Sequence, residues 1–453
     1  MSQATGTTLL ERVRPDRALV GPAVWGLLTA IAFATLSWRR FERLEPTSWD
    51  NAIFEQAIAG YSRLGWPIVD IKGPGFNILG DHFSPVTALV APFYRIWPAP
   101  QTLLVAQAVL IGVSVVVVTA VAVRVTGRPA GWVLGVAYGL SFGVQSAVVA
   151  DFHEVAFGAP LLALAGAAYV ERRWGAVVAW SLPLLLVKED LGLTVAVIGF
   201  VLWLAGERRR GTWLALGALV WTGLVLLVLI PAFNPSGQYD YASSVGGERG
   251  LLEVVLADPG TKLATVALTL GVTGLAAVWS PWVLLVVPTF AWRFTADNAF
   301  YWGTDWHYSL LLMPIVFVAA VDGMRRRPAL RWAVVPAAVV TAFTLWGSPL
   351  ATLLDGRTWE PSDRAGAAAR VQAAIPDGAS VETDIGLITH LATDHRVYWL
   401  GTIGDARPRY VVLDQYANVG SPPDALAYAR DKYGGRWRLV LDDAGYQVVT
   451  RDP

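Results

Sequence analysis

Long apolar segments separated by short polar loops recur along most of this chain. Nearly uncharged stretches follow one another between residues 18 and 345, and most of the charge lies in the connections between them. A helix of about 20 apolar residues crosses the roughly 30 Å hydrocarbon core of a bilayer. The pattern therefore predicts a polytopic α-helical membrane protein of about eleven spans. The expected spans are Ala18–Ser37, Thr102–Val123, Ala130–Val149, Val155–Val170, Ala176–Val187, Leu191–Ala205, Thr212–Pro231, Leu263–Val278, Trp282–Ala291, Ser309–Val321 and Arg331–Leu345.

Composition supports the membrane assignment and excludes several classes of function. Hydrophobic residues make up 55% of the chain and charged residues 15%, and the mean hydropathy is +0.47. A water-soluble domain of this length would not have such values. The net charge of zero gives no reason to expect a nucleic-acid partner. Cysteine is absent, which excludes disulfides and thiolate metal sites. The abundance of Ala, Val, Leu, Gly and Arg suggests a GC-rich bacterial genome, and we expect a location in the plasma membrane.

The arginines predict the orientation of the spans. Basic clusters occupy alternate loops, and basic loops usually remain on the cytoplasmic side. We therefore expect a cytoplasmic N-terminus, a retained first span, and an external C-terminal region. One cluster, Arg39, Arg40 and Arg43, conflicts with this rule because it follows the first span on the outer side. The clusters that agree are Arg124 and Arg128, Arg172 and Arg173, Arg208–Arg210, and Arg325–Arg327.

The predicted outer loop, residues 38–100, holds the most unusual stretch of the chain. Residues Trp49 to Pro85 are too polar and too rich in glycine and proline to form a span. Asp50 to Ile58 has the apolar spacing of a short amphipathic helix. At the start of that helix Asp50 is either a capping carboxylate or a catalytic carboxylate at the mouth of a membrane cavity. The apolar piece Pro85 to Trp97 is short enough to be re-entrant or interfacial.

Further ionisable residues fall on the same predicted face. Ionisable groups at a membrane are costly and usually functional, so we expect them to converge on one site. Individually they also fit helix caps or, for Lys188 to Asp190, a self-neutralised turn. Carboxylates beside histidines suit a divalent cation, but a D-x-H pair chelates only from a loop or extended segment. The candidate metal ligands are Asp81, His82, Asp151, His153, Glu154, Asp305 and His307.

The composition changes after the last span. Residues 1–350 are expected to form the transmembrane domain, and residues 351–453 a small external α/β domain. Its predicted helices are Asp363–Ala374 and Pro423–Tyr433, and its predicted strands are Ser380–Thr383, Val397–Trp399, Tyr410–Leu413, Trp437–Leu441 and Tyr446–Thr450.

Several motifs resemble those of one protein family. They are Asp50-x-x-Ile53-Phe54-x-Gln56, Leu79-Gly80-Asp81-His82-Phe83-Ser84-Pro85, Pro92-Phe93-Tyr94, Leu103-Leu104-x-x-Gln107, Asp151-Phe152-His153, Lys188-Glu189-Asp190 and His307-Tyr308. Together they resemble the DUF2079 family of bacterial and archaeal membrane proteins of unknown function. That family is similar in layout to GT-C glycosyltransferases, which carry a catalytic acid in the first outer loop and use polyprenyl-phosphate-linked sugars.

The resemblance implies a role for each candidate residue. Asp50 would be the general base that deprotonates the sugar acceptor, and the partners would be membrane lipid and a polyprenyl-phosphate-linked sugar. A divalent metal ion is the one cofactor that the residues suggest. The substrate-binding candidates are Glu55, Lys72, His82, Lys188, Glu189, Arg293 and His307.

Two other classes of function fit the same sequence. A transporter or flippase would place Glu189 near the middle of the bilayer, between the two short apolar segments that flank it. A non-catalytic scaffold would leave Asp50, Asp81 and Asp305 scattered and separately capped. The position of Glu189 relative to Asp50 therefore separates the enzyme from the transporter.

Overall fold

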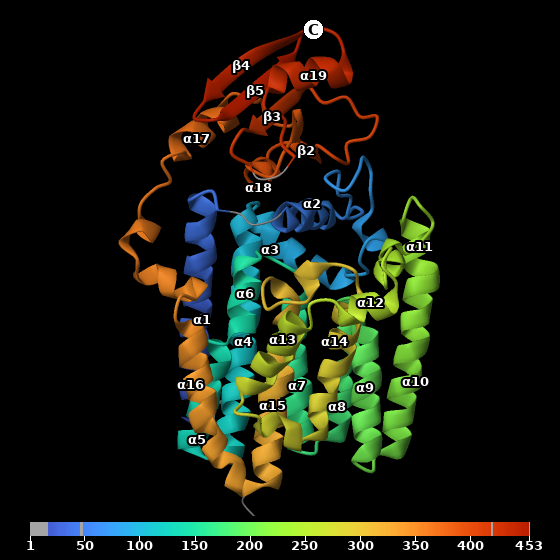
Figure 1. Ribbon diagram of the computed structural model, residues 1–453, viewed down its shortest axis with the longest axis vertical. Coiled ribbons are helices and arrows are strands. Elements are labelled where there is room, and N and C mark those ends of the chain that lie inside the picture. Colours follow the sequence, from blue (N-terminus) through green and yellow to red (C-terminus); the bar gives the residue numbers. More distant parts are fainter. Residues whose placement is uncertain (1–16, 46–48, 418–419, 453) are drawn as a thin grey trace, which may run out of the picture.

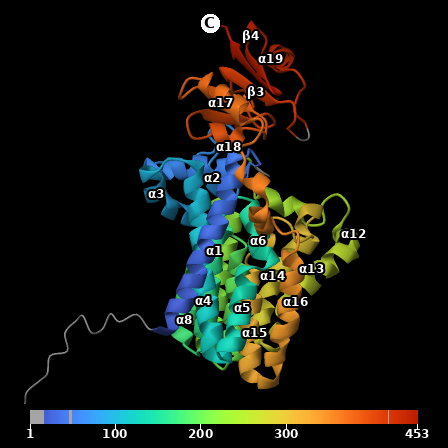
Figure 2. The ribbon, with the colours of Figure 1, turned by 90° about the vertical axis from the view of Figure 1, so that its left-hand side faces the viewer.

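The chain forms a helical bundle with a small α/β domain at one end, as the computed structural model shows (Figure 1). The structure describes residues 17–45, 49–417 and 420–452. Helices α2 (Asp50–Ser62) and α3 (Ala91–Ile96) lie between the bundle and the domain, and Figure 2 shows the same order from the side. We call this end of the bundle the domain end.

Apolar helices of very different lengths build the bundle. Among the described residues, six helical stretches are long and apolar enough to cross a membrane, and three shorter apolar helices accompany them. The helices are α1 (Arg17–Glu42), α4 (Pro100–Thr126), α5 (Arg128–Gly139), α6 (Phe142–Val149), α7 (Gly158–Val170), α8 (Trp174–Ser181), α9 (Leu191–Leu204), α10 (Arg208–Leu224), α11 (Ile230–Phe233), α12 (Leu251–Leu256), α13 (Pro259–Gly271), α14 (Val286–Thr295), α15 (Leu312–Arg326) and α16 (Val334–Leu345).

The structure does not confirm eleven full spans. The segment expected as Leu263–Val278 is α13, of 13 residues, followed by a turn with Gly274 in the left-handed region. The segment expected as Trp282–Ala291 becomes a 3-10 turn and then α14, of 10 residues. At 1.5 Å per residue neither helix is longer than about 20 Å, well short of the hydrocarbon thickness. Proline at 281 and the glycines near 274 interrupt these helices.

Close approach of backbones holds the bundle together. Helix α15 lies at its centre and packs against both α4 and α7. Where α1 crosses α4, a Cβ atom on Gly26 would lie only 2.6 Å from the carbonyl oxygen of Gly112. Where α9 crosses α10, a Cβ on Gly199 would lie 2.7 Å from the carbonyl oxygen of Gly211. Small residues at these crossings let the two backbones pack closely. This packing stabilises the bundle, because lipid provides no hydrophobic driving force between helices.

Arginine-bearing loops gather at the end opposite the α/β domain (Figure 1). Arg124 pairs with Glu171 at 2.6 Å, which joins the loops after α4 and α7. Arg326 donates to the Tyr169 hydroxyl at 3.2 Å and pairs with the fully buried Asp322. We call this the arginine end.

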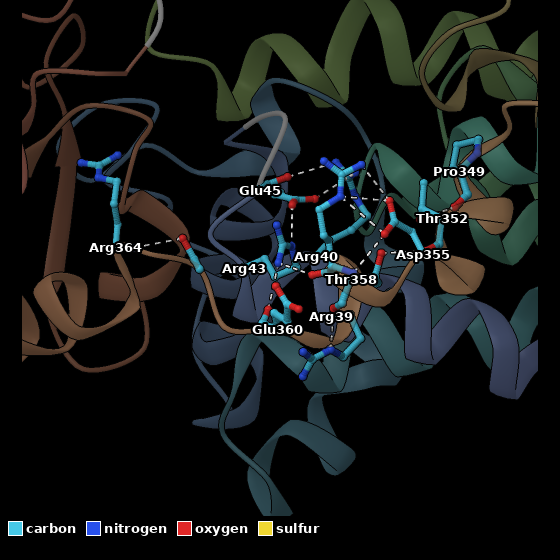
Figure 3. Close-up of polar contacts among 12 residues, drawn as sticks. Arg39, Arg40, Arg43, Glu45, Pro349, Thr352, Asp355, Thr358, Glu360 and Arg364 are labelled. Carbon is cyan, nitrogen blue, oxygen red and sulfur yellow. Dashed lines mark hydrogen bonds and ion pairs between the residues drawn. The ribbon is translucent and has the colours of Figure 1, made fainter.

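The three arginines that conflict with the charge rule have a structural role. Arg39 donates to the carbonyl of Thr358 at 3.1 Å, and Arg43 donates to the carbonyl of Glu360 at 2.8 Å (Figure 3). Arg40 and Arg43 also pair with Glu45. The cluster therefore fastens the connector between α16 and the α/β domain to the end of α1. These contacts account for the presence of three arginines at this end of α1.

The C-terminal residues fold into a five-stranded sheet. Its order is β2-β1-β3-β5-β4, with β1 parallel to β2 and β3, and β5 antiparallel to β3 and β4. The strands lie within a residue or two of the positions predicted from the alternating apolar pattern. The elements are α17 (Ala365–Ala373), β1 (Ser380–Thr383), α18 (Ile388–Leu391), β2 (Arg396–Trp399), β3 (Tyr410–Asp414), α19 (Ala425–Tyr433), β4 (Trp437–Asp443) and β5 (Tyr446–Arg451).

Helix α2 belongs to the cores of both parts. Its residues Ala52, Ile53 and Ala57 pack in one cluster with apolar side chains of the α/β domain. Its residues Phe54 and Ile58 pack in another cluster with residues of α3, α4 and the loop before α7. The α/β domain thus rests on the bundle through this helix.

Polar contacts add to this shared core, and one of them involves an ionisable side chain. Glu55 is fully buried and accepts hydrogen bonds from the Tyr94 hydroxyl at 2.9 Å and from Thr393 Oγ1 at 2.5 Å. Thr393 belongs to the α/β domain, so Glu55 joins the two parts. Burial raises the pKa of Glu55 to about 7, although both hydrogen bonds oppose that rise.

We predict that this contact weakens as pH rises. Between the ordinary pKa of 4.5 and about 7, the folded protein holds a proton on Glu55 that the unfolded chain has lost. The free energy of unfolding should therefore fall across that window, by up to about 1.4 kcal/mol per pH unit. Glu55→Gln keeps the accepting oxygen without the charge, so it should be more stable than the wild type at pH 8. Thermal unfolding from pH 5 to 8 measures this, with the exposed Glu248→Gln as the control. Parallel wild-type and Glu55→Gln curves would contradict the prediction.

Candidate functional site

A cavity of about 430 Å³ lies at the domain end of the bundle. Widely separated parts of the chain line it: the start of α2, the loop before α3, the segment before α7, the turn before α9 and the start of α9, the end of α10 and the turn after it, the loop between α11 and α12, and α14 with the segment that follows it. Its ionisable lining residues are Asp50, Lys72, Asp81, His82, His153, Glu154, Lys188, Glu189, Asp190 and His307. Its aromatic lining residues are Trp49, Phe54, Tyr239, Tyr241, Trp292, Tyr301 and Tyr308.

Asp50 faces two histidines in this cavity. It is the first residue of α2, whose N-cap is Trp49, so its carboxylate does not occupy the capping position. Asp50 Oδ2 lies 3.4 Å from His153 Nε2, and the ring of His153 stacks on that of His307 at 3.6 Å between centroids. Burial lowers the pKa of His153, but the Asp50 carboxylate, together with Glu154 and the carbonyl of Asp151, outweighs burial and raises that pKa. An acid and a base are thus held in contact at the start of α2.

Strained backbone places both of these histidines. Asp151 has φ of 66° and Trp306 has φ of 63°, a region that residues other than glycine rarely adopt. Each lies one or two residues before a stacked histidine. Strain of this kind persists where the surrounding structure fixes it and is common at functional sites.

Gln107 of α4 holds the strained segment before α7. Its amide donates to the carbonyls of Ala147 and Asp151, at 3.1 and 2.7 Å, and its oxygen accepts from the His153 amide at 3.0 Å. Gln107 was not predicted as a site residue, although it lies in one of the motifs that resemble the family. The available signal was a polar side chain within an otherwise apolar span.

Glu189 forms a second acid–histidine pair. His82 Nδ1 lies 2.8 Å from Glu189 Oε1, and the Phe83 amide donates to Glu189 Oε2 at 3.2 Å. The Tyr239 hydroxyl donates to the same carboxylate at 3.2 Å, and Tyr241 stacks on His82. Burial would raise the pKa of Glu189, but the adjacent His82 and Lys188 lower it. Glu189 therefore joins the turn before α9 to the loop before α3.

Both lysines of the cavity are paired with carboxylates. Lys188 Nζ lies 2.8 Å from Glu154 Oε1, and Lys72 Nζ lies 3.1 Å from Asp81 Oδ2. The acidic and basic groups therefore form four close pairs, three of which join different segments. Removing one partner would leave the other charge buried, which is costly.

Some buried polar atoms of the lining have no hydrogen-bond partner among the described residues. They include Asp190 Oδ1, Trp292 Nε1 and His307 Nδ1. Native proteins satisfy most buried polar atoms, so each exception calls for an explanation. The indole can only donate and the carboxylate only accept when ionised. A ligand that carries both donors and acceptors would satisfy them together.

Four residues predicted for the site lie elsewhere. Glu55 is at the contact with the α/β domain, on another face of α2. Arg293 is fully buried and donates to the carbonyls of Tyr301 and Gly303, so it holds the loop that carries His307. The side chains of Asp151 and Asp305 are not among the cavity-lining residues, and Asp305 is exposed.

The proposed metal ligands do not gather into a ready-made centre. Within the described ranges, no group of three or more His, Asp or Glu side chains is arranged to hold a metal ion. The stacked rings of His153 and His307 meet face to face. A ligating nitrogen points along the plane of its ring, so this stacking does not direct both rings at one ion.

Tyr239 and Tyr241 were not predicted as site residues. They come from the polar segment after α11, which folds back over the cavity to reach Glu189 and His82. Their spacing of two residues, in a tyrosine-containing loop between apolar helices, is the only sequence signal.

Comparison with known proteins agrees with the motif analysis. No curated protein is detectably similar to this chain. The sequence profile of the DUF2079 family, described as a predicted membrane protein, matches residues 40–446. That match covers α2, every ionisable residue of the cavity and most of the α/β domain. The chain therefore belongs to the DUF2079 family of predicted membrane proteins.

Proposed function

We propose that this protein is a GT-C-type glycosyltransferase that moves a sugar from a polyprenyl phosphate to an acceptor hydroxyl. The observation that carries the proposal is the Asp50–His153 contact at the head of α2, inside a cavity at the end of the bundle. A base in such a place meets both a membrane-bound donor and an acceptor that arrives from water.

The cavity contains groups suited to each step of this reaction. Asp50 takes the proton from the acceptor hydroxyl, and His153 stabilises its carboxylate in the correct orientation. The acceptor oxygen then bonds to the anomeric carbon, while the bond from that carbon to the phosphate oxygen breaks. Lys188 supplies positive charge for the departing polyprenyl phosphate, with Glu154 as its partner between turnovers.

The lining also suits a sugar. Hydroxyl groups both donate and accept, which matches the unpartnered atoms of Asp190, Trp292 and His307. Tyrosine and tryptophan rings around the cavity provide apolar faces for the C–H surfaces of a sugar ring.

The arrangement of Glu189 favours this proposal over a transporter. A transporter site is expected near the middle of the bilayer, between broken helices. Glu189 instead bonds to His82 and Phe83 of the loop before α3, in the same cavity as Asp50. A scaffold without a site would not require these carboxylates to converge.

We further propose that the arginine end is cytoplasmic and that the α/β domain is external. The bias of basic loops toward the cytoplasm supports this orientation. The donor sugar would then be used on the outer face of the plasma membrane.

Reporter fusions are expected to give opposite sides for the two ends. A fusion after Arg210 should report the cytoplasm, and a fusion after Pro453 should report the exterior, because they follow the arginine end and the α/β domain respectively. A pair of reporters active only on each side measures this. The same side for both fusions would contradict the orientation but would leave the cavity unaffected.

Asp50→Asn is expected to remove activity without unfolding the protein. The amide keeps the size of the side chain but cannot take a proton, so turnover should fall roughly 10²–10⁴-fold. Loss of the charge beside the start of α2 should cost at most about 1 kcal/mol. His153 loses the carboxylate that raises its pKa, so it can give up its proton and no unpaired charge is left buried. Transfer of radiolabelled hexose from a polyprenyl phosphate to membrane acceptors measures turnover, and thermal unfolding measures stability.

The exposed Asp305→Asn is the matched control for that experiment. It makes the same chemical change outside the cavity and should leave turnover within about twofold, as surface substitutions usually do. A fully active Asp50→Asn protein would remove the catalytic assignment, and equal losses in both variants would show that the cavity does not determine activity.

A further inference from the structure

The cavity extends to the lipid-facing side of α9. Leu193 lines the cavity and yet is 41% exposed. Phe200 and Leu204, seven and eleven residues further along α9, are similarly exposed. These spacings correspond to two and three helical turns, so the three side chains share one face. Leu193 therefore begins a row of outward-facing apolar side chains on α9, and it also forms part of the cavity wall.

The opposite edge of this wall is also apolar. Val245 lines the cavity, is 55% exposed, and is held by a backbone bridge to Ala296 at the end of α14. Leu226 lies in the same lining. Thr222 contributes the hydroxyl group here, and it donates to the Ala218 carbonyl at 2.9 Å. The edge therefore presents apolar surface beside the polar cavity.

A local irregularity in the neighbouring helix lies beside this edge. Residues Val225–Leu229, which follow α10 and include Leu226, form a π-helical turn. Such turns are rare and often occur at functional sites. Helix α10 packs chiefly against α9, and its Trp221 indole donates to the Leu185 carbonyl. Val225 of this turn packs with Leu79 and Phe83 of the loop before α3, so the turn forms the side of the cavity that carries Leu226.

We propose that the cavity opens sideways into the bilayer over Leu193, Leu226 and Val245, and that this opening holds the hydrocarbon chain of an amphiphilic ligand. The polar group of that ligand lies among the paired charges, and its chain passes between α9 and Val245 into the lipid. The inference rests on the proposed function for the identity of the chain, which is then the polyprenyl chain of the donor. It assigns Leu193 and Val245 as the residues that admit the donor.

A second apolar groove is the alternative place for the hydrocarbon chain. About 410 Å³ of space lies between α3 and α4, lined by Phe93, Trp97 and Val109 among other apolar residues. The edge-to-face rings of Phe54 and Phe152, 5.4 Å apart, lie in the packed cluster beside this groove. A chain in the groove would have to cross that layer to bring its polar group to Asp50. The groove is therefore a control for the sideways opening.

Photocrosslinking with a lipid phosphate tests the proposal. The full chain in phosphatidylcholine nanodiscs is incubated with farnesyl phosphate that carries a diazirine at the end of its chain, and the adducts are located by mass spectrometry. We expect adducts on α9 near Leu193 and on the segment around Val245, and we expect excess unlabelled farnesyl phosphate to remove them. Adducts confined to residues 89–110, or no competed adduct, would overturn the proposal.

Tryptophan substitutions supply the second measurement. Leu193→Trp narrows the opening and should weaken farnesyl phosphate binding at least tenfold, since losing two buried methylene contacts already exceeds that factor. Phe200→Trp, on the same face of α9 but outside the cavity, and Val109→Trp, in the other groove, should change it less than twofold. Loss of binding in Val109→Trp alone would overturn the proposal.

These results separate the opening from the proposed reaction. Asp50→Asn should keep the adducts near Leu193 while it loses turnover. Adducts at the opening in a wild-type protein that transfers no sugar would support the opening and reject the glycosyltransferase. Sugar transfer with adducts only between α3 and α4 would support the glycosyltransferase and reject the sideways opening.

Discussion

Helix α2 is the common hydrophobic element of the bundle and the α/β domain, and the geometry of the cavity depends on it. One side of α2 packs in the domain through Ala52 and Ala57, and another packs in the bundle through Phe54 and Ile58. A helix of 13 residues would be marginal alone in water, so these two apolar surfaces are what keep it folded. Asp50 is fixed in space only because both surfaces are covered.

The second constraint is electrostatic. Charges withdrawn from water lose their hydration, and pairing recovers that loss only in part. The protein supplies these partners itself, since Asp50, Asp81, Glu154 and Glu189 each lie against a basic group. A ligand that enters must therefore exchange partners with the protein. Groups that both donate and accept are best suited to such an exchange, because they can replace either member of a pair.

Sequence patterns predicted the elements well where the local signal was strong. The strands of the α/β domain follow an alternating apolar pattern, and the long apolar runs of α1 and α4 have the length of a span. The short helices α13 and α14 were harder, because glycine and proline shorten a helix without changing its average hydropathy. Hydropathy alone does not reveal whether a segment crosses the bilayer or stops within the protein.

The candidate site was predictable in part, for reasons of geometry. Asp50 and Glu55 are neighbours in sequence, but five residues turn a helix by about 140° net, so their side chains lie on different faces. Arg293 resembled a free cation, although the carbonyls of residues eight and ten positions further along bind its guanidinium. Tyr239 and Tyr241 reach the cavity because their loop folds back, and no local pattern encodes that path.

The contacts that fasten the α/β domain to the bundle have a further consequence for biosynthesis. Arg43 binds a carbonyl 317 residues further along the chain, and Glu55 accepts from a hydroxyl 338 residues further along. The last cavity-lining residue is Tyr308, so the ribosome makes every cavity-lining segment before it makes these partners. Until then, one apolar side of α2 lacks the domain residues that cover it. The architecture makes the covering of α2 a late event of synthesis, so a product that ends after α16 carries the lining residues without the contacts that fix α2.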